Sequence, residues 1–178
     1  MSMLYSVPIY WLANFQPTAT AFFRWVIWLF LDLFAAESLV ILICSVWNEF
    51  RASLIATIIA NGLWICVGGI LIPPYKLNVF WRYSFHLFSY QTWIFRALMA
   101  NEFENRVFTC EAGDNGTCSC MYSSILLPQC LVDGNAVLSH YGSEQSAVSY
   151  NILILLAIIS TYRLLAWIIL KAKNRSNL

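Results

Sequence analysis

The stretch Thr20–Val46 reads TAFFRWVIWLFLDLFAAESLVILICSV, and it decides the fold class. A helix of about 20 mainly apolar residues spans the hydrocarbon core of a bilayer, so this stretch is long enough to cross a membrane. Ala52–Ile72 and Tyr150–Leu170 meet the same criterion. The sequence therefore predicts an all-α membrane protein with three full transmembrane helices, over residues 20–46, 52–72 and 150–170.

The opening segment, residues 1–15, is apolar but short, and it has neither a basic leader region nor a small-residue cleavage site. These features are not those of a signal peptide. We expect a partial N-terminal helix here, the end of a helix whose beginning is absent.

The overall composition excludes several classes of function. The 178 residues are 60% hydrophobic and only 11% charged, where a soluble domain has about 25% charged residues. The net charge of +1 gives no basic field, so we expect no nucleic-acid partner. The chain contains neither a phosphate-binding loop nor an H-E-x-x-H zinc motif. We therefore expect no catalytic residues, no metal and no cofactor in this chain.

Basic residues beside the third predicted span indicate the orientation. Lys171, Lys173 and Arg175 follow it directly, and basic flanks stay in the cytoplasm. We expect a multi-pass protein of the plasma membrane, with residues 171–178 as a cytoplasmic tail and residues 73–149 on the exoplasmic side. Arg24, near the outer end of the first span, argues weakly for the opposite orientation.

Residues 73–103 are dense in Phe, Tyr and Trp, which favour the headgroup level of a membrane. Pro73-Pro74 stops the second span, because proline has no amide hydrogen to donate. The composition predicts a re-entrant or interfacial helix. The alternative is a fourth complete span over Phe85–Ala100, which is short for a bilayer and contains Arg96.

Residues 104–149 form an expected extracellular loop with four cysteines, at Cys110, Cys118, Cys120 and Cys130. An even set of cysteines in an exoplasmic loop predicts two disulfides, with three possible connectivities. The alternative is a zinc site that also uses His140, although the cysteine spacing is not that of paired C-x2-C ligands. Asn115 begins a glycosylation sequon in the same loop.

Ionisable and polar residues inside the predicted spans need protein or water around them, because a charge at the centre of a bilayer disfavours insertion. Asp32 and Asn61 are expected to be buried polar residues of the first and second spans. Glu37 and Arg163 lie about 13 and 11 Å from the cytoplasmic ends of their spans, at 1.5 Å per residue. We predict an ion pair between them that fixes the register of two helices; a role in substrate or proton movement is the alternative. The small residues around Glu37 (Ala35, Ala36 and Ser38) would allow the two helices to approach closely.

The order of these features resembles a known family. The most specific part is the run Ala97-Leu98-Met99-Ala100-Asn101-Glu102-Phe103 with cysteines directly after it. Earlier parts are Tyr10-Trp11-Leu12, Ala21-Phe22-Phe23, Ala36-Glu37-Ser38 and Gly68-Gly69-Ile70-Leu71-Ile72-Pro73. Over essentially its whole length, the chain resembles the C-terminal half of the ABC-2-type membrane domain of G-subfamily ATP-binding cassette transporters, the White-like and pleiotropic-drug-resistance group.

This resemblance implies a function. The chain would be a partial ABC-2 type transmembrane domain, residues 1–178, of an exporter of lipids, sterols or hydrophobic xenobiotics. A nucleotide-binding domain outside the chain would bind ATP and Mg, and a second transporter half would complete the path. By the likeness, Gly62 and Ile65 would line the substrate cavity, and Ile70 and Leu71 would form the gate above it. Gly62 is smaller than the bulky residue expected at that position.

The alternative function is that of a non-transporting membrane organiser of the tetraspanin type. Such proteins also combine several spans with a large disulfide-bonded outer loop. The chain lacks their Cys-Cys-Gly run and contains the aromatic re-entrant stretch, and both features favour the exporter.

Overall fold

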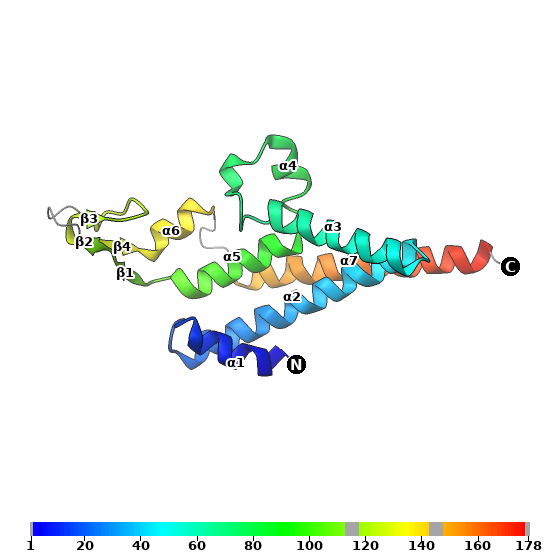
Figure 1. Ribbon diagram of the computed structural model, residues 1–178, viewed down its shortest axis with the longest axis horizontal. Helices are drawn as coiled ribbons and strands as arrows, with labels where there is room; N and C mark the ends of the chain where they lie inside the picture. Colours follow the sequence, from blue (N-terminus) through cyan, green and yellow to red (C-terminus); the bar gives the residue numbers. More distant parts are fainter. Residues whose placement is uncertain (1, 113–117, 143–147, 177–178) are drawn as a thin grey trace.

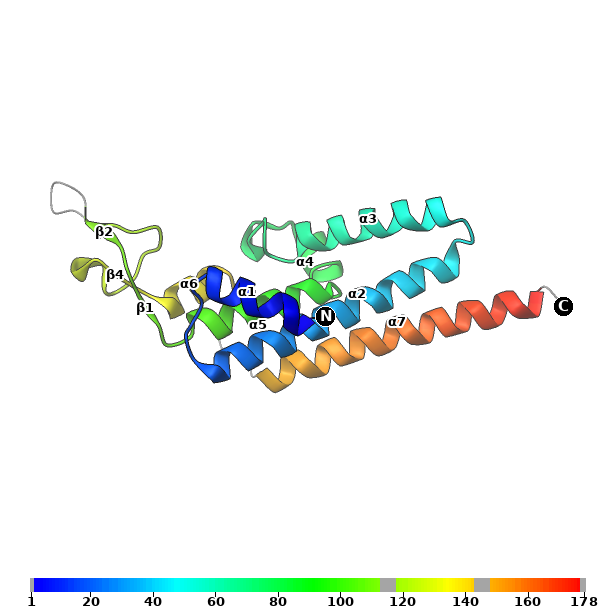
Figure 2. The same ribbon diagram turned by 60° about the horizontal axis from the view of Figure 1, so that its bottom comes forward.

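The computed structural model describes residues 2–112, 118–142 and 148–176. Three long helices run side by side along the length of the molecule (Figures 1 and 2). They are α2 (Ala19–Val46), α3 (Phe50–Val67) and α7 (Val148–Ser176). All three are long and apolar enough to cross a membrane. The predicted all-α membrane fold with three spans is therefore confirmed.

Helix α1 (Ser2–Leu12) folds back against the first turns of α2. Tyr10 joins the two helices, because its ring contacts Phe22 and Trp25 at centroid distances of 5.1 and 5.7 Å. The hydroxyl of Thr18 accepts a hydrogen bond from the amide of Ala21 and begins α2. At the other end of the molecule, Lys173 of α7 donates to the carbonyl oxygens of Ser45 and Val46 at 3.2 Å. The ends of α2 and α7 therefore lie at the same level.

Helix α3 ends at Val67, five residues before the boundary expected from hydropathy. The cause is local: Gly68 caps the helix, and Gly69 has φ of +95°, a left-handed conformation that glycine adopts at helix ends. At 1.5 Å per residue, α3 is about 27 Å long and α2 about 42 Å. The apolar residues 70–72 belong to the connection after the helix and not to the span.

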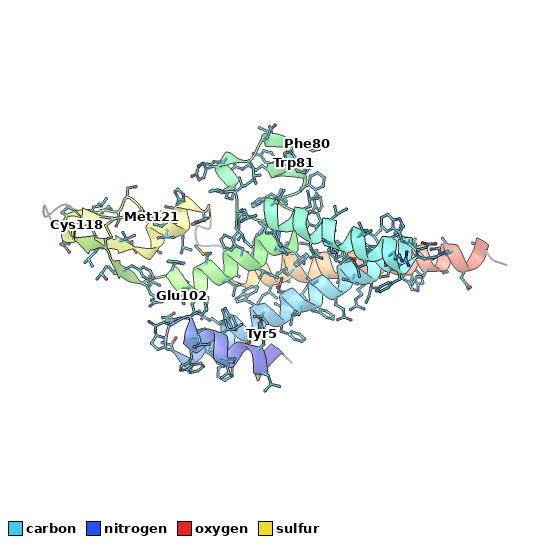
Figure 3. All side chains as sticks on the ribbon, viewed as in Figure 1. Tyr5, Phe80, Trp81, Glu102, Cys118 and Met121 are labelled. Atoms are coloured by element: carbon cyan, nitrogen blue, oxygen red, sulfur yellow. A yellow bond between two sulfur atoms is a disulfide. The ribbon has the colours of Figure 1, made fainter. Side chains whose placement is uncertain are left out.

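The aromatic region 73–103 contains two short helices and a 3-10 turn instead of one continuous element. The turn η1 covers Pro74–Lys76, α4 covers Val79–Ser84 and α5 covers Tyr90–Phe103. With 14 residues, α5 is too short to span a bilayer, which argues against the alternative of a fourth span. It lies in the bundle beside α2 and α7 (Figure 2). The bulky Phe80 and Trp81 of α4 project away from the bundle (Figure 3).

The core of the bundle is built by α2, α5 and α7. Ala35 and Ser38 are fully buried, and these small side chains let α7 approach α2 closely. Helix α3 adds only partly buried residues to this core. The fully packed members are Trp28, Ala35, Leu39 and Ile43 from α2, Tyr90, Trp93, Ile94 and Ala97 from α5, and Leu155 and Ile159 from α7.

The chain between α5 and α7 forms a small unit beyond the end of the bundle (Figure 1). It contains two antiparallel strand pairs, β1 (Val107–Thr109) with β4 (Leu131–Asp133) and β2 (Glu111–Ala112) with β3 (Cys118–Ser119). The turn η2 (Leu127–Gln129) and helix α6 (Gly134–His140) complete it. In the β1–β4 pair, Phe108 lies opposite Val132.

Candidate functional site

The candidate site begins with an exposed apolar stripe on α3. Ile55 and Ile58 have 57% and 63% of their surface exposed, and Ile65 has 38%. Gly62 lies between Ile58 and Ile65, and a Cβ added to it would meet nothing within 4 Å. These four residues recur every three or four positions, so they lie on one face of the helix. We call them the α3 stripe.

The two residues expected to form a gate, Ile70 and Leu71, follow the end of α3. Both are exposed, at 47% and 64%. They lie just after Gly69, so the position of the connection depends on how the end of α3 is held.

A buried histidine from a distant part of the sequence holds this end. His86 is 2% exposed, and its Nδ1 lies 2.6 Å from the carbonyl oxygen of Val67. Its Nε2 lies 3.0 Å from Nη2 of Arg96 in α5. A carbonyl oxygen only accepts and a guanidinium only donates, so Nδ1 bears the proton and Nε2 accepts. We call His86, Val67 and Arg96 the His86 cluster.

The environment of His86 favours this neutral ring. Burial lowers its pKa below the usual value, and the positive charges of Arg96 and Arg82 lower it further, whereas the hydrogen bond to Val67 opposes them. Protonation would also convert Nε2 into a donor facing another donor. This cluster could not be predicted from the sequence, since a single histidine in an aromatic stretch matches no motif.

Asn61 of α3 lies six residues before Val67 and connects α3 to α5. Its Oδ1 accepts a hydrogen bond from the hydroxyl of Tyr90 at 2.8 Å, and its Nδ2 donates to the carbonyl oxygen of Thr57 at 3.0 Å. Asn61 is half-buried, as is Asp32 of α2. Asp32 makes no hydrogen bond or ion pair with any residue that the structure describes.

The structure brings Glu37 and Arg163 together at the α2–α7 contact. Nη2 of Arg163 lies 3.5 Å from Oε1 of Glu37, and its Nε donates to the hydroxyl of Ser38 at 3.0 Å. The guanidinium also lies 5.3 Å from the centre of the Phe34 ring. The Glu37 side chain remains 62% exposed and that of Arg163 40%. An ion pair so exposed at this depth needs a further protein surface or water beside it.

The small unit between α5 and α7 contains two disulfides, Cys110–Cys120 and Cys118–Cys130, and we call it the disulfide unit or outer unit. This selects one of the three connectivities and uses the four sulfurs that a zinc site would need. His140 instead contacts Tyr75, whose hydroxyl lies 3.3 Å from its Nε2. Asn115 lies outside the described residues.

The run at the end of α5 anchors this helix to the turn between α1 and α2. Asn101 donates to the carbonyl oxygen of Ala21 at 3.1 Å, and Glu102 accepts from the amide of Gln16 at 3.1 Å. Glu102 also pairs with Arg106. Figure 3 shows Glu102 at the end of α5, near the α1–α2 turn. The Asn101-Glu102 motif therefore has a structural role: it joins α5 to the start of α2 and to the turn before it.

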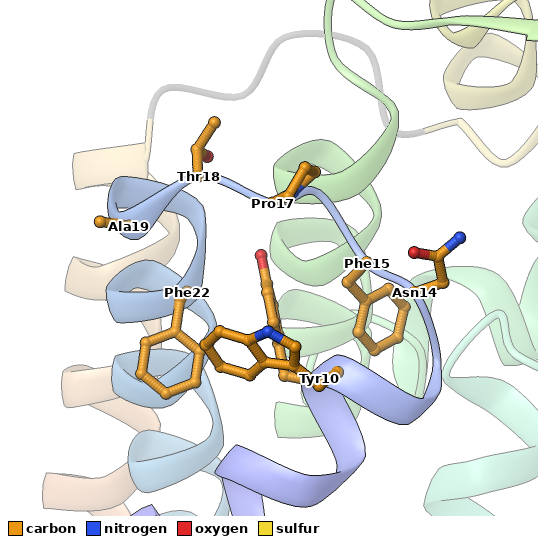
Figure 4. Close-up of a pocket in the computed structure, with 8 residues that line it drawn as sticks. Tyr10, Asn14, Phe15, Pro17, Thr18, Ala19 and Phe22 are labelled. Carbon is orange, nitrogen blue, oxygen red and sulfur yellow. The ribbon is translucent and has the colours of Figure 1, made fainter.

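Two hollows flank the α1–α2 turn. The first is an aromatic pocket of about 310 Å³ lined by Tyr10, Trp11, Phe15 and Phe22, with Asn14 and Thr18 at its edge (Figure 4). The second is a polar pocket of about 250 Å³ between the start of α2 and the end of α5. Rings half in contact with water are typical of the headgroup level of a membrane.

Three apolar spans, a short helix packed among them and a disulfide-bonded unit at one end define an integral, multi-pass membrane protein. Residues 1–103 match the ABC-2 type transporter family, and the chain belongs to this family. It is a component of the membrane part of ABC transporters.

Curated relatives agree with this assignment over almost the whole chain. The chain is 28% identical to ABC transporter G family member 23 of Arabidopsis thaliana over 97% of its own length and 26% of the relative's. It is 23% identical to member 5 of the same plant, over 97% of this chain and 24% of the relative, and 26% identical to member 4, over 96% and 28%. The chain thus spans about a quarter of the length of these relatives.

Proposed function

We propose that this chain forms the distal part of the membrane path of an ABC-type exporter that moves lipids, sterols or hydrophobic xenobiotics outward. The observation that supports this most is the α3 stripe. A long apolar helix face with a glycine at its centre leaves room for an amphipathic molecule between this chain and a second transporter half. In this proposal, Gly62 and Ile65 line the cavity, and Ile70 and Leu71 close its outer end.

The energy source lies in polypeptide outside this chain. A nucleotide-binding domain outside the chain binds ATP and Mg and drives the movement. The basic residues after α7 support a cytoplasmic C-terminus in this proposal. The disulfide unit, with a glycan on Asn115, is then exoplasmic, and we propose the plasma membrane as the location. The Glu37–Arg163 pair then has the structural role of registering α2 against α7.

An efflux assay tests the proposed cavity. Gly62→Trp, introduced at the native gene, places a large side chain at the centre of the α3 stripe. We expect the variant to lose ATP-dependent export of a fluorescent sterol or hydrophobic dye. Leu153→Trp is the control, because it introduces the same side chain on α7, at a position that is 66% exposed. Unchanged export with Gly62→Trp, at an equal amount of protein in the membrane, would contradict the proposal.

A photolabelling experiment tests the position of the substrate directly. We expect a photoactivatable sterol to label peptides of α3 in the wild-type protein, and the labelling to fall with Gly62→Trp but not with Leu153→Trp. Equal labelling of α3 in all three proteins would indicate simple exposure to lipid and would overturn the assignment of the cavity.

A further inference from the structure

The polar pocket beside the α1–α2 turn is lined by two residues of opposite charge, Arg24 and Glu104. Its polar and charged lining residues are Gln16, Thr18, Thr20, Arg24, Asn101, Glu104 and Asn105, and Ala21 and Ala100 complete it. Within the part of the chain that the structure describes, neither Arg24 nor Glu104 forms an ion pair, with each other or with another residue. Both side chains are exposed.

The depth of this pocket in a membrane follows from α2. Arg24 lies five residues after Ala19, the first residue of α2, which is about 7.5 Å along the helix axis. The aromatic pocket occupies the same level on the other side of the turn. Arginine near a helix end extends its charge towards the headgroups, so the pocket opens where lipid headgroups lie.

Helix stability does not explain why an acidic residue, Glu104, stands at the end of α5. This residue is the C-cap of α5, where the helix dipole favours a cation and disfavours an anion. Two residues earlier, Glu102 is fully engaged by Gln16 and Arg106. The carboxylate of Glu104 is therefore an unpaired anion in a place that gains nothing from it within the described chain.

We propose that this pocket binds the headgroup of a zwitterionic phospholipid from the leaflet on the side of the disulfide unit. Arg24 binds the phosphate, because a guanidinium donates paired hydrogen bonds to phosphate oxygens. Glu104 binds the positively charged amine of the same headgroup. The hydroxyls of Thr18 and Thr20 and the amide of Gln16 or Asn101 are polar groups of the kind that orient a bound ligand.

The bound lipid has a structural role and is distinct from any transported molecule. It joins the start of α2 to the end of α5, the same two elements that Asn101 connects through Ala21. The site is remote from the α3 stripe in sequence, and the inference does not depend on the proposed export function.

Native mass spectrometry of the purified full chain tests the inference, with equal amounts of phosphatidylcholine, phosphatidylethanolamine and phosphatidylglycerol. We expect one zwitterionic lipid to be retained in preference to phosphatidylglycerol. Arg24→Gln lowers its retention by about tenfold or more, as expected for loss of hydrogen bonds to a charged group. Arg24→Lys keeps part of it, and Glu104→Gln removes the preference over phosphatidylglycerol.

Matched controls are Arg51→Gln and Glu49→Gln, which change the same residue types at the opposite end of the bundle and leave retention unchanged. Circular dichroism and the two intact disulfides identify variants that fail to fold. Equal retention of phosphatidylglycerol by the wild-type protein would overturn the proposal, and so would undiminished retention by Arg24→Gln. Binding of soluble glycerophosphocholine in place of the lipid would overturn the assignment to a membrane lipid.

Discussion

Nδ1 of His86 lies 2.6 Å from the carbonyl oxygen of Val67, so a side chain 19 positions away satisfies the end of α3. The carbonyl groups of a last helical turn have no partner within their own helix. Here a buried ring fills that role, and its other nitrogen accepts from Arg96 of α5. His86 therefore links Val67, three residues before the proposed gate, to α5.

Removing this residue tests its role. We expect His86→Ala to lower the free energy of unfolding by about 1–3 kcal/mol, because the buried carbonyl of Val67 loses its donor. Thermal unfolding in detergent micelles measures the change. His140→Ala is the control. His140 is exposed, so this substitution should lower the free energy of unfolding much less. Equal effects of the two substitutions would show that His86 does not hold the end of α3.

The protonation of His86 predicts a pH dependence of stability. Its pKa in the folded protein is lowered, chiefly by burial, below the value of about 6.5 expected in the unfolded chain. The unfolded state therefore binds more protons below pH 6.5, and stability falls as the pH decreases from about 6.5 towards the folded pKa. We expect this fall between pH 7.5 and 5.5 to be smaller in His86→Gln. An identical pH profile in both proteins would exclude His86 as its source.

The Glu37–Arg163 pair predicts a charge-swap rescue. Arg163→Glu places two carboxylates together, and each unpaired charge near the helix centre disfavours insertion by about 2.5–3.5 kcal/mol. We expect the double variant Glu37→Arg with Arg163→Glu to recover membrane-inserted yield, with a coupling of about 0.6 kcal/mol and at most about 1.7 kcal/mol. Glu37→Arg with Lys173→Glu is the control that should not recover. Equally poor yields for both double variants would mean that the contact is not an energetic pair.

The disulfide connectivity predicts which pairs of cysteines can be removed together. Cys110→Ser with Cys120→Ser leaves Cys118–Cys130 intact, so we expect no free thiol in the loop and a loss of stability of about 2–4 kcal/mol. Cys110→Ser with Cys130→Ser separates both pairs and leaves two reactive thiols. Maleimide labelling followed by peptide mass analysis distinguishes these outcomes. Free thiols in the first variant would disprove the connectivity.

Gly134 predicts a sharp steric effect. A Cβ at this position would lie 1.9 Å from the carbonyl oxygen of Phe103, between α5 and α6. We expect Gly134→Ala to destabilise the outer unit by about 1–3 kcal/mol, because backbone must move to accept the methyl group. Gly62→Ala is the matched control, where open space and the helix propensity of alanine predict no loss of stability. The rate of limited proteolysis of the outer unit is measured for both variants and compared with the wild-type protein.

Sequence reasoning identified the spans, the fold class and the disulfide-forming cysteines. It also brought together Glu37 and Arg163, because depth along two helices can be counted from their ends. It placed the end of α3 too late, since hydropathy continues through Ile70–Ile72 while Gly69 turns the backbone. Asn101 and Glu102 belong to a recognisable sequence motif, but their partners Ala21 and Gln16 lie about 80 residues earlier in the chain.

Apolar length and flanking charge are local properties of the chain, so the amino-acid sequence alone predicts which segments enter the bilayer. Folding sets which distant residues meet: His86 contacts Val67, Cys118 is bonded to Cys130, and Arg24 and Glu104 line the same pocket. A polar or sulfur atom takes the partner that folding brings within reach, and that proximity is not encoded at either position alone.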